Sequence, residues 1–235
     1  MSGPSFFFIR HGQLIEPYID HLTMDYKTLT ELSLGILDPG INANAPQLFE
    51  QRTSGVDFSQ VKTIYYNNSG KSSTRSLESA KCIIDNLEKR FGKSIRLLGM
   101  PEIGEVFFDV SGLISQEEFN QHGMALIRTA LYRASISGGV AEPMVQIAER
   151  IKIIHKIIEE RSKKNESVLF VTHDFFMRFI EVYITREQRL DNVTVEDIEH
   201  TSLNSYFCGF RTDSALRILD PSFGGNFCKN LKSKQ

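Results

Sequence analysis

Short apolar runs alternate along the chain with longer segments in which apolar residues recur at helical spacing. The runs are rich in β-branched and aromatic residues, which is typical of buried strands. The predicted strands cover residues 6–9, 61–66, 95–98, 168–171, 205–210 and 216–219. Turn-forming residues follow several of these runs, and we expect the last strand to lie at an edge of the sheet.

The intervening segments predict amphipathic helices, because their apolar residues return every three or four positions. The predicted helices cover residues 45–53, 73–91, 117–133, 142–163 and 175–184. Asp174 is well suited to cap the last of them. Residues 14–40 are expected to be irregular, with residues 29–32 as a possible capping segment before the first helix.

Strands that alternate with helices predict an α/β fold. We expect a three-layer, doubly wound, mostly parallel sheet with helices on both faces. The 235 residues suit a single domain, 1–235. Within it, residues 106–140 are predicted to form an insertion over the ligand-binding edge of the sheet, and residues 221–235 a flexible tail.

Composition excludes some classes of partner. Lys and Arg number 27 and Asp and Glu 29, for a net charge of -2, so we expect neither nucleic acid nor membrane as a partner. Cys82, Cys208 and Cys228 are odd in number and widely spaced, which predicts free thiols. The first apolar run is too short for a secretion signal or a membrane span, so a cytoplasmic protein is expected. The sequence carries no indication of oligomeric state.

Four residues that suit phosphate chemistry stand where the predicted fold would bring them together. Arg10 and His11 end the first strand, Arg75 lies in the first turn of a helix, and His173 follows another strand. Each alone could be an ordinary polar residue, but parallel strands deliver their carboxyl ends to one edge. Guanidinium groups match phosphate oxygens, and an unprotonated imidazole can attack phosphorus.

No metal or other cofactor is expected at this site, because two guanidinium groups can neutralise the charge of a phosphoryl group. The remaining histidines lack a recognisable zinc spacing. They are His21, His122, His155 and His200.

Three motifs together resemble the histidine phosphatase superfamily, which has the phosphoglycerate-mutase-like fold. They are Arg10-His11-Gly12 after a strand, Arg75 to Ala80 opening a helix, and Val168 to His173 before another helix. They span residues 6–184. The resemblance implies that His11 is the catalytic nucleophile and forms a phosphohistidine. It also implies that Arg10, Gly12, Arg75 and His173 bind the phosphoryl group, with His173 part of the catalytic set.

A general acid must protonate the leaving alkoxide, and the family carries a glutamate after the third strand. Glu102, Glu105 and Asp109 compete for this role. Glu105 fits best, because the run from Glu105 to Asp109 resembles the pattern of the phosphatase branch. Its aromatic neighbours are expected to raise its pKa.

The sequence also departs from the family pattern. Asp174 occupies a position that is usually glycine, and the chain has no tryptophan, which argues against a sugar-phosphate mutase. The favoured function is a metal-independent phosphatase that hydrolyses small phosphomonoesters through His11. The alternatives are a phosphoglycerate-type mutase, or a non-catalytic phospho-ligand-binding member of the fold, which Asp174 would suit.

Overall fold

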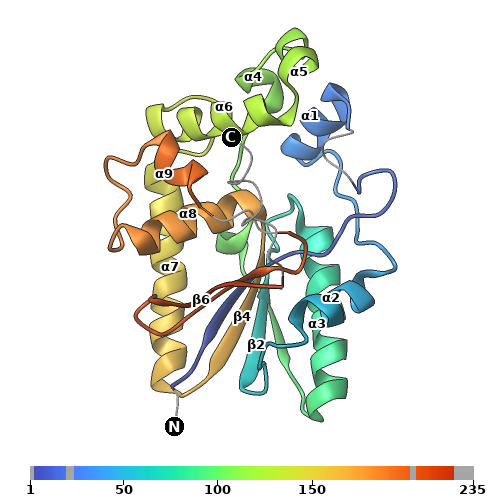
Figure 1. The fold of residues 1–235 in the computed structure, drawn as a ribbon, viewed down its shortest axis with the longest axis vertical. Coiled ribbons are helices and arrows are strands. Elements are labelled where there is room, and N and C mark those ends of the chain that lie inside the picture. Colours follow the sequence, from blue (N-terminus) through green and yellow to red (C-terminus); the bar gives the residue numbers. More distant parts are fainter. Residues whose placement is uncertain (1–2, 20–23, 202–204, 225–235) are drawn as a thin grey trace, which may run out of the picture.

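Six strands form one sheet in the computed structural model, which describes residues 3–19, 24–201 and 205–224 (Figure 1). The strands are β1 (Phe6–Arg10), β2 (Val61–Tyr66), β3 (Arg96–Gly99), β4 (Ser167–Thr172), β5 (Gly209–Thr212) and β6 (Ile218–Phe223). Their order is β3-β2-β4-β1-β5-β6, so β6 lies at an edge, as predicted. The strands from β3 to β1 are parallel, and β5 is antiparallel to both β1 and β6.

Helices cover both faces of the sheet. Successive side chains of β1 point to opposite faces, so Phe6 and Phe8 join one core while Phe7 and Ile9 join the other. The first core is covered by α7 (Met144–Lys163), α8 (Asp174–Thr185) and α9 (Val195–Glu199), and the second by α2 (Ala45–Thr53) and α3 (Ser73–Phe91). The predicted three-layer α/β fold is confirmed.

A group of helices, which we call the cap, lies beyond the carboxyl ends of the parallel strands (Figure 1). It consists of α1 (Tyr26–Leu34), α4 (Val110–Leu113), α5 (Gln116–His122) and α6 (Met124–Ser137). A 3-10 turn, η1 (Pro101–Ile103), follows β3. A separate apolar cluster that includes Leu29, Val110 and Ile127 joins α1 to α4 and α6. The cap therefore has its own small core above the sheet.

The prediction that residues 14–40 are irregular is wrong, because this segment contains α1. Asp25 begins the helix, since its carboxylate accepts the backbone N–H of Thr28 at 2.7 Å. Gly35 ends it in the left-handed conformation at φ 72°. The helix is nine residues long and has only Leu29 buried, so its apolar periodicity is too brief to stand out.

The single helix predicted over residues 117–133 is also wrong, because α5 and α6 divide at Gly123. This glycine has a φ of 63° and a ψ of -156°, a conformation that a side chain strongly disfavours. The apolar spacing continues across the break and therefore conceals it. The short helices α4 and α9 are further elements that the sequence pattern does not predict.

The C-terminal strands are displaced from their predicted positions. Residues 205–208 form a turn with Phe207 at a φ of 56°, and β5 begins only at Gly209. Strand β6 runs from Ile218 to Phe223, so the predicted flexible tail is wrong for residues 221–223. Residues 225–235 lie outside the described residues. No helix in the described ranges is long and apolar enough to cross a bilayer.

The cysteines agree with the prediction as far as they are described. Cys82 and Cys208 are free thiols, and burial raises the pKa of each. Cys228 lies outside the described residues.

Candidate active site

The two site histidines lie side by side because their strands are neighbours. β1 and β4 pair in parallel with Arg10 opposite Thr172, so the residue after each strand reaches the same edge. The His11 and His173 ring centroids are 5.1 Å apart. Both side chains are buried, with 4% and 0% of their surface exposed. The ends of β1 and β4 therefore lie together, as predicted.

A hydrogen bond to the Gly12 carbonyl oxygen fixes the His11 ring in one tautomer. Its Nδ1 lies 2.8 Å from the carbonyl oxygen of Gly12. A carbonyl oxygen can only accept, so Nδ1 carries the proton and Nε2 keeps its lone pair. The His11 backbone N–H donates to the Thr172 carbonyl oxygen at 2.9 Å, which holds the residue against β4. The geometry thus presents an imidazole with a free nitrogen lone pair.

Gly12 is held between the first strand and α3. Its backbone N–H donates to Ser79 Oγ at 2.8 Å, and Ser79 Oγ donates to the Arg75 carbonyl oxygen at 2.5 Å. A Cβ at this position would lie 2.7 Å from the Phe207 ring, so no side chain fits without rearrangement. The predicted contact between the Gly12 N–H and a phosphoryl oxygen would therefore require the amide to give up its hydrogen bond to Ser79 Oγ.

Burial keeps both histidines neutral. It lowers the pKa of His11 well below its ordinary value, and the positive charges of Arg75 and Arg10 lower that pKa further. The pKa of His173 is lowered in the same way, first by burial and then by Arg75, Arg10 and Arg150. An unprotonated imidazole is the form that can act as a nucleophile.

Arg75 stands in the first turn of α3, as predicted, and some of its N–H groups make no hydrogen bond to the described residues. Its Nη2 donates to Ser72 Oγ, and its Nη1 forms an ion pair with Asp38 Oδ1 at 3.9 Å. Among the described residues, its Nε and Nη1 have no hydrogen-bond partner. The guanidinium is 9% exposed and can therefore offer these donors to a phosphoryl group.

Arg10 is held by an aromatic residue that the sequence does not identify. Its guanidinium carbon lies 4.3 Å from the centroid of the Tyr206 ring, and that ring is 5.6 Å from the His11 ring. Tyr206 and Asp38 both enter the site from segments without regular structure. No motif marks either residue, because each reaches the site only through contacts distant in sequence.

Within the described part of the chain, the ring of His173 lacks the hydrogen-bond partners that a buried imidazole normally has. It is fully buried, yet neither ring nitrogen has a hydrogen-bond partner among the described residues. A buried polar group without a partner costs roughly 1–3 kcal/mol, so such groups are rare away from functional sites. A phosphoryl oxygen would satisfy the ring nitrogen that carries the proton.

Glu105 lies at the start of α8 and against α3. Its Oε1 accepts the backbone N–H groups of Val106 at 3.0 Å and Phe176 at 3.1 Å. Burial raises the pKa of Glu105 to about 7, and the negative charge of Asp174 adds to the increase. The two hydrogen bonds and Arg75 oppose it. The carboxyl group is therefore partly protonated at neutral pH, as a general acid requires.

The two competing acids lie outside the pocket that contains Glu105. Asp109 is the N-cap of α4, where its Oδ1 accepts the Ser111 backbone N–H at 2.9 Å. Glu102 belongs to the turn η1 and does not line the pocket that contains Glu105. Among the three candidates, the geometry favours Glu105.

Asp174 does not cap α8, so that prediction is wrong by one residue. His173 is the N-cap and Asp174 is the first helical residue. The Asp174 carboxylate instead accepts a hydrogen bond from Arg178 Nε at 3.1 Å, and the Arg178 side chain is 1% exposed. The buried guanidinium one turn along the helix explains why an acid stands here, since a buried charge requires a partner.

Comparison with solved structures decides the fold. Mycobacterial glucosyl-3-phosphoglycerate phosphatase superposes with a TM-score of 0.62 at 14% identity, over 93% of this chain and 98% of that chain. Phosphoglycerate mutase from Bacillus anthracis gives 0.53 at 18% identity, over 92% of each chain. An Escherichia coli protein described as a putative α-ribazole-5′-phosphate phosphatase gives 0.56 at 15% identity, over 92% and 96%.

The chain has the fold of these proteins, which is the phosphoglycerate-mutase-like fold. The resemblance seen in the sequence is thus confirmed at the level of the fold. No protein-family model and no curated protein matches the sequence.

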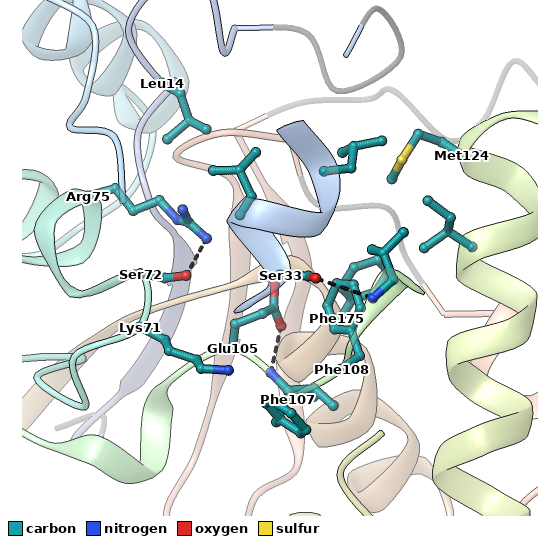
Figure 2. A pocket seen from close by; sticks show the side chains of 15 residues that line it. Leu14, Ser33, Lys71, Ser72, Arg75, Glu105, Phe107, Phe108, Met124 and Phe175 are labelled. Atoms are coloured by element: carbon teal, nitrogen blue, oxygen red, sulfur yellow. Dashed lines mark hydrogen bonds between the residues drawn. The ribbon is translucent and has the colours of Figure 1, made fainter. Parts of the chain in front are cut away.

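A pocket of about 90 Å³ opens between the cap and the site (Figure 2). Arg75, Glu105 and Lys71 lie toward one side of it, and Phe108 and Met124 toward the other. Most of its other walls are apolar. The described residues contain no group of three His, Cys, Asp or Glu side chains placed to hold a metal ion.

Proposed function

We propose that this protein hydrolyses small phosphomonoesters through a phosphohistidine on His11, without a metal ion. One observation carries the proposal. Two buried, neutral histidines and two arginines meet at the carboxyl ends of β1 and β4, and donors of His173 and Arg75 lack partners among the described residues. These groups are complementary to a phosphoryl group.

In the first step, the lone pair of His11 Nε2 attacks phosphorus, and the bond from phosphorus to the leaving oxygen breaks. The bonding electrons leave with that oxygen, which takes the proton of Glu105. Arg10, Arg75 and His173 bind the three phosphoryl oxygens, whose charge is spread in the transition state.

In the second step, water attacks the phosphohistidine, and the Glu105 carboxylate takes a proton from that water. The nitrogen–phosphorus bond breaks, and its electrons return to His11 Nε2. Inorganic phosphate leaves, and Glu105 is again protonated. We assign Gly12 a packing role, because its N–H is already bound to Ser79 Oγ.

A cytoplasmic location belongs to this proposal as well. Its support is the pair of free thiols at Cys82 and Cys208, which a reducing compartment maintains.

Phosphate release from an aryl phosphate in the presence of a chelator tests the proposal. The wild type is expected to turn over, and His11→Ala to lose a factor on the order of 10³ or more in kcat, because the nucleophile is absent. His122→Ala is the matched control, since His122 is an exposed histidine at the end of α5, and it should retain full activity.

Three results would contradict the proposal. Activity that disappears with chelator but survives His11→Ala would exclude this mechanism. A wild type as inert as the mutant across a broad phosphate panel, yet binding phosphate esters, would favour the non-catalytic alternative. Isomerisation of a phosphorylated acid faster than phosphate release would favour a mutase.

A further inference from the structure

We propose that the substrate is the phosphomonoester of an apolar alcohol, alkyl or aryl, whose carbon chain occupies the pocket beneath the cap. This inference rests on the proposed function and specifies its substrate class.

The pocket borders two of the groups that take part in the proposed reaction. Arg75 and Glu105 form part of its lining, and in the proposed reaction they bind the phosphoryl group and protonate the leaving oxygen. The leaving group must therefore begin beside Glu105. Figure 2 shows the charged side chains toward one side of the cavity and Phe108 and Met124 toward the other, so a bound alcohol extends from the charged side to the apolar side.

The walls away from the charged side are aliphatic, aromatic or thioether side chains. Leu29 and Leu32 come from α1, Val106 and Phe108 from the segment before α4, and Ile127 from α6. Leu29, Val106 and Ile127 are almost fully buried, at 6%, 2% and 1% exposure. These side chains offer no hydrogen bond to a ligand.

The two serine hydroxyls in the lining already take part in hydrogen bonds within the protein. Ser33 Oγ donates to the Thr30 carbonyl oxygen at 2.8 Å and accepts the Val110 N–H at 3.3 Å. Ser72 Oγ accepts from Arg75. A sugar or glycerate in this pocket would therefore lose hydrogen bonds to water without replacement, which disfavours its binding.

Among the described residues, Lys71 is the one cation in the lining apart from Arg75. Its Nζ lies 4.0 Å from the centroid of the Phe107 ring, and the Phe107 side chain is 44% exposed, so both belong to the rim of the pocket. The ammonium group is therefore placed at the mouth rather than among the apolar walls. A leaving group that carries a negative charge could pair with Lys71 only at the mouth of the pocket, away from its apolar walls.

A homologous series of n-alkyl phosphates tests the inference, because leaving groups of nearly equal pKa differ only in the apolar surface that they bury. We expect kcat/KM to rise about fourfold for each added methylene until the pocket is filled. Propyl phosphate should exceed glycerol phosphate, its hydroxylated counterpart, by about tenfold or more.

Pocket variants localise the effect. Leu32→Gln and Met124→Gln are expected to flatten the dependence of kcat/KM on chain length, because a longer chain then meets a polar amide in place of an apolar wall. Leu34→Gln is the matched control: Leu34 is on the same helix and also partly buried, but does not line the pocket. It should retain the wild-type dependence.

Two results would overturn the inference while leaving the proposed function intact. One is His11-dependent hydrolysis whose kcat/KM does not change with chain length. The other is a preference for a carboxylate-terminated chain over a methyl-terminated chain of equal length, which would assign the pocket to anions through Lys71. Absence of His11-dependent hydrolysis of any phosphate, including aryl phosphates, would instead contradict the proposed function.

Discussion

The surroundings of Glu105 raise its pKa into the range that a general acid needs. Burial disfavours its carboxylate, and Asp174 adds a nearby negative charge, so its pKa rises to about 7. His11 is shifted in the opposite sense, since burial and the neighbouring positive charges lower its pKa. The acid is therefore protonated and the nucleophile unprotonated in the same pH range.

This pair of shifts predicts an alkaline limb in the pH profile. A raised pKa means that Glu105 holds its proton below about pH 7 and loses it as the pH rises. We therefore expect kcat/KM for an alkyl phosphate to fall about tenfold per pH unit above that value. Steady-state phosphate release between pH 5 and pH 9 checks the prediction.

Two controls identify the titrating group. Glu105→Gln should remove the alkaline limb and lower kcat/KM by about 10²–10⁴ at pH 6, because the leaving alkoxide has lost its acid. An aryl phosphate with a good leaving group should be affected much less. Glu102→Gln, outside the pocket, should keep the wild-type profile. An alkaline limb that persists in Glu105→Gln would assign it to another group.

At the scale of elements, the start of α8 combines a site residue with a structural ion pair. His173 is the N-cap, and Asp174 in the first turn binds Arg178 one turn later. The Arg178 side chain is 1% exposed, and its Nη1 also donates to Thr201 Oγ1 at 3.3 Å. Asp174 thus supports the helix that positions His173, and its carboxylate is committed to Arg178.

Asp174→Ala is expected to lower the free energy of unfolding by about 3 kcal/mol, because it leaves a buried guanidinium without its carboxylate. Adding Arg178→Met should recover most of the loss, since the unpaired charge is then gone. Urea denaturation measures both. Glu149→Ala, which removes the acid of the exposed pair Lys152–Glu149, should cost less than about 1 kcal/mol. A stable Asp174→Ala would show that Arg178 finds compensation elsewhere.

At the scale of the whole molecule, the sheet and its two helical layers could be predicted from the sequence. A strand that is buried on both faces needs consecutive apolar residues. Runs such as Phe6 to Ile9 are therefore visible in the sequence without knowledge of the tertiary structure. The residues that end those strands, including His11 and His173, were predictable for the same reason.

The cap and the outer part of the site could not be predicted in the same way. Helix α1 buries a single side chain, and the break between α5 and α6 depends on the backbone of one glycine, Gly123. Tyr206 and Asp38 contact the site arginines from irregular segments. Their positions depend on tertiary packing, which no short-range pattern encodes.

The central claim is that His11 carries the phosphoryl group covalently. Mixing the enzyme with an aryl phosphate, quenching in base, where a phosphohistidine survives, and measuring the intact mass and fragments of the protein tests it most directly. We expect one phosphoryl group per chain, located on His11, that accumulates when Glu105→Gln slows its hydrolysis. Turnover without any phosphorylated enzyme, or a phosphoryl group on another residue, would contradict it.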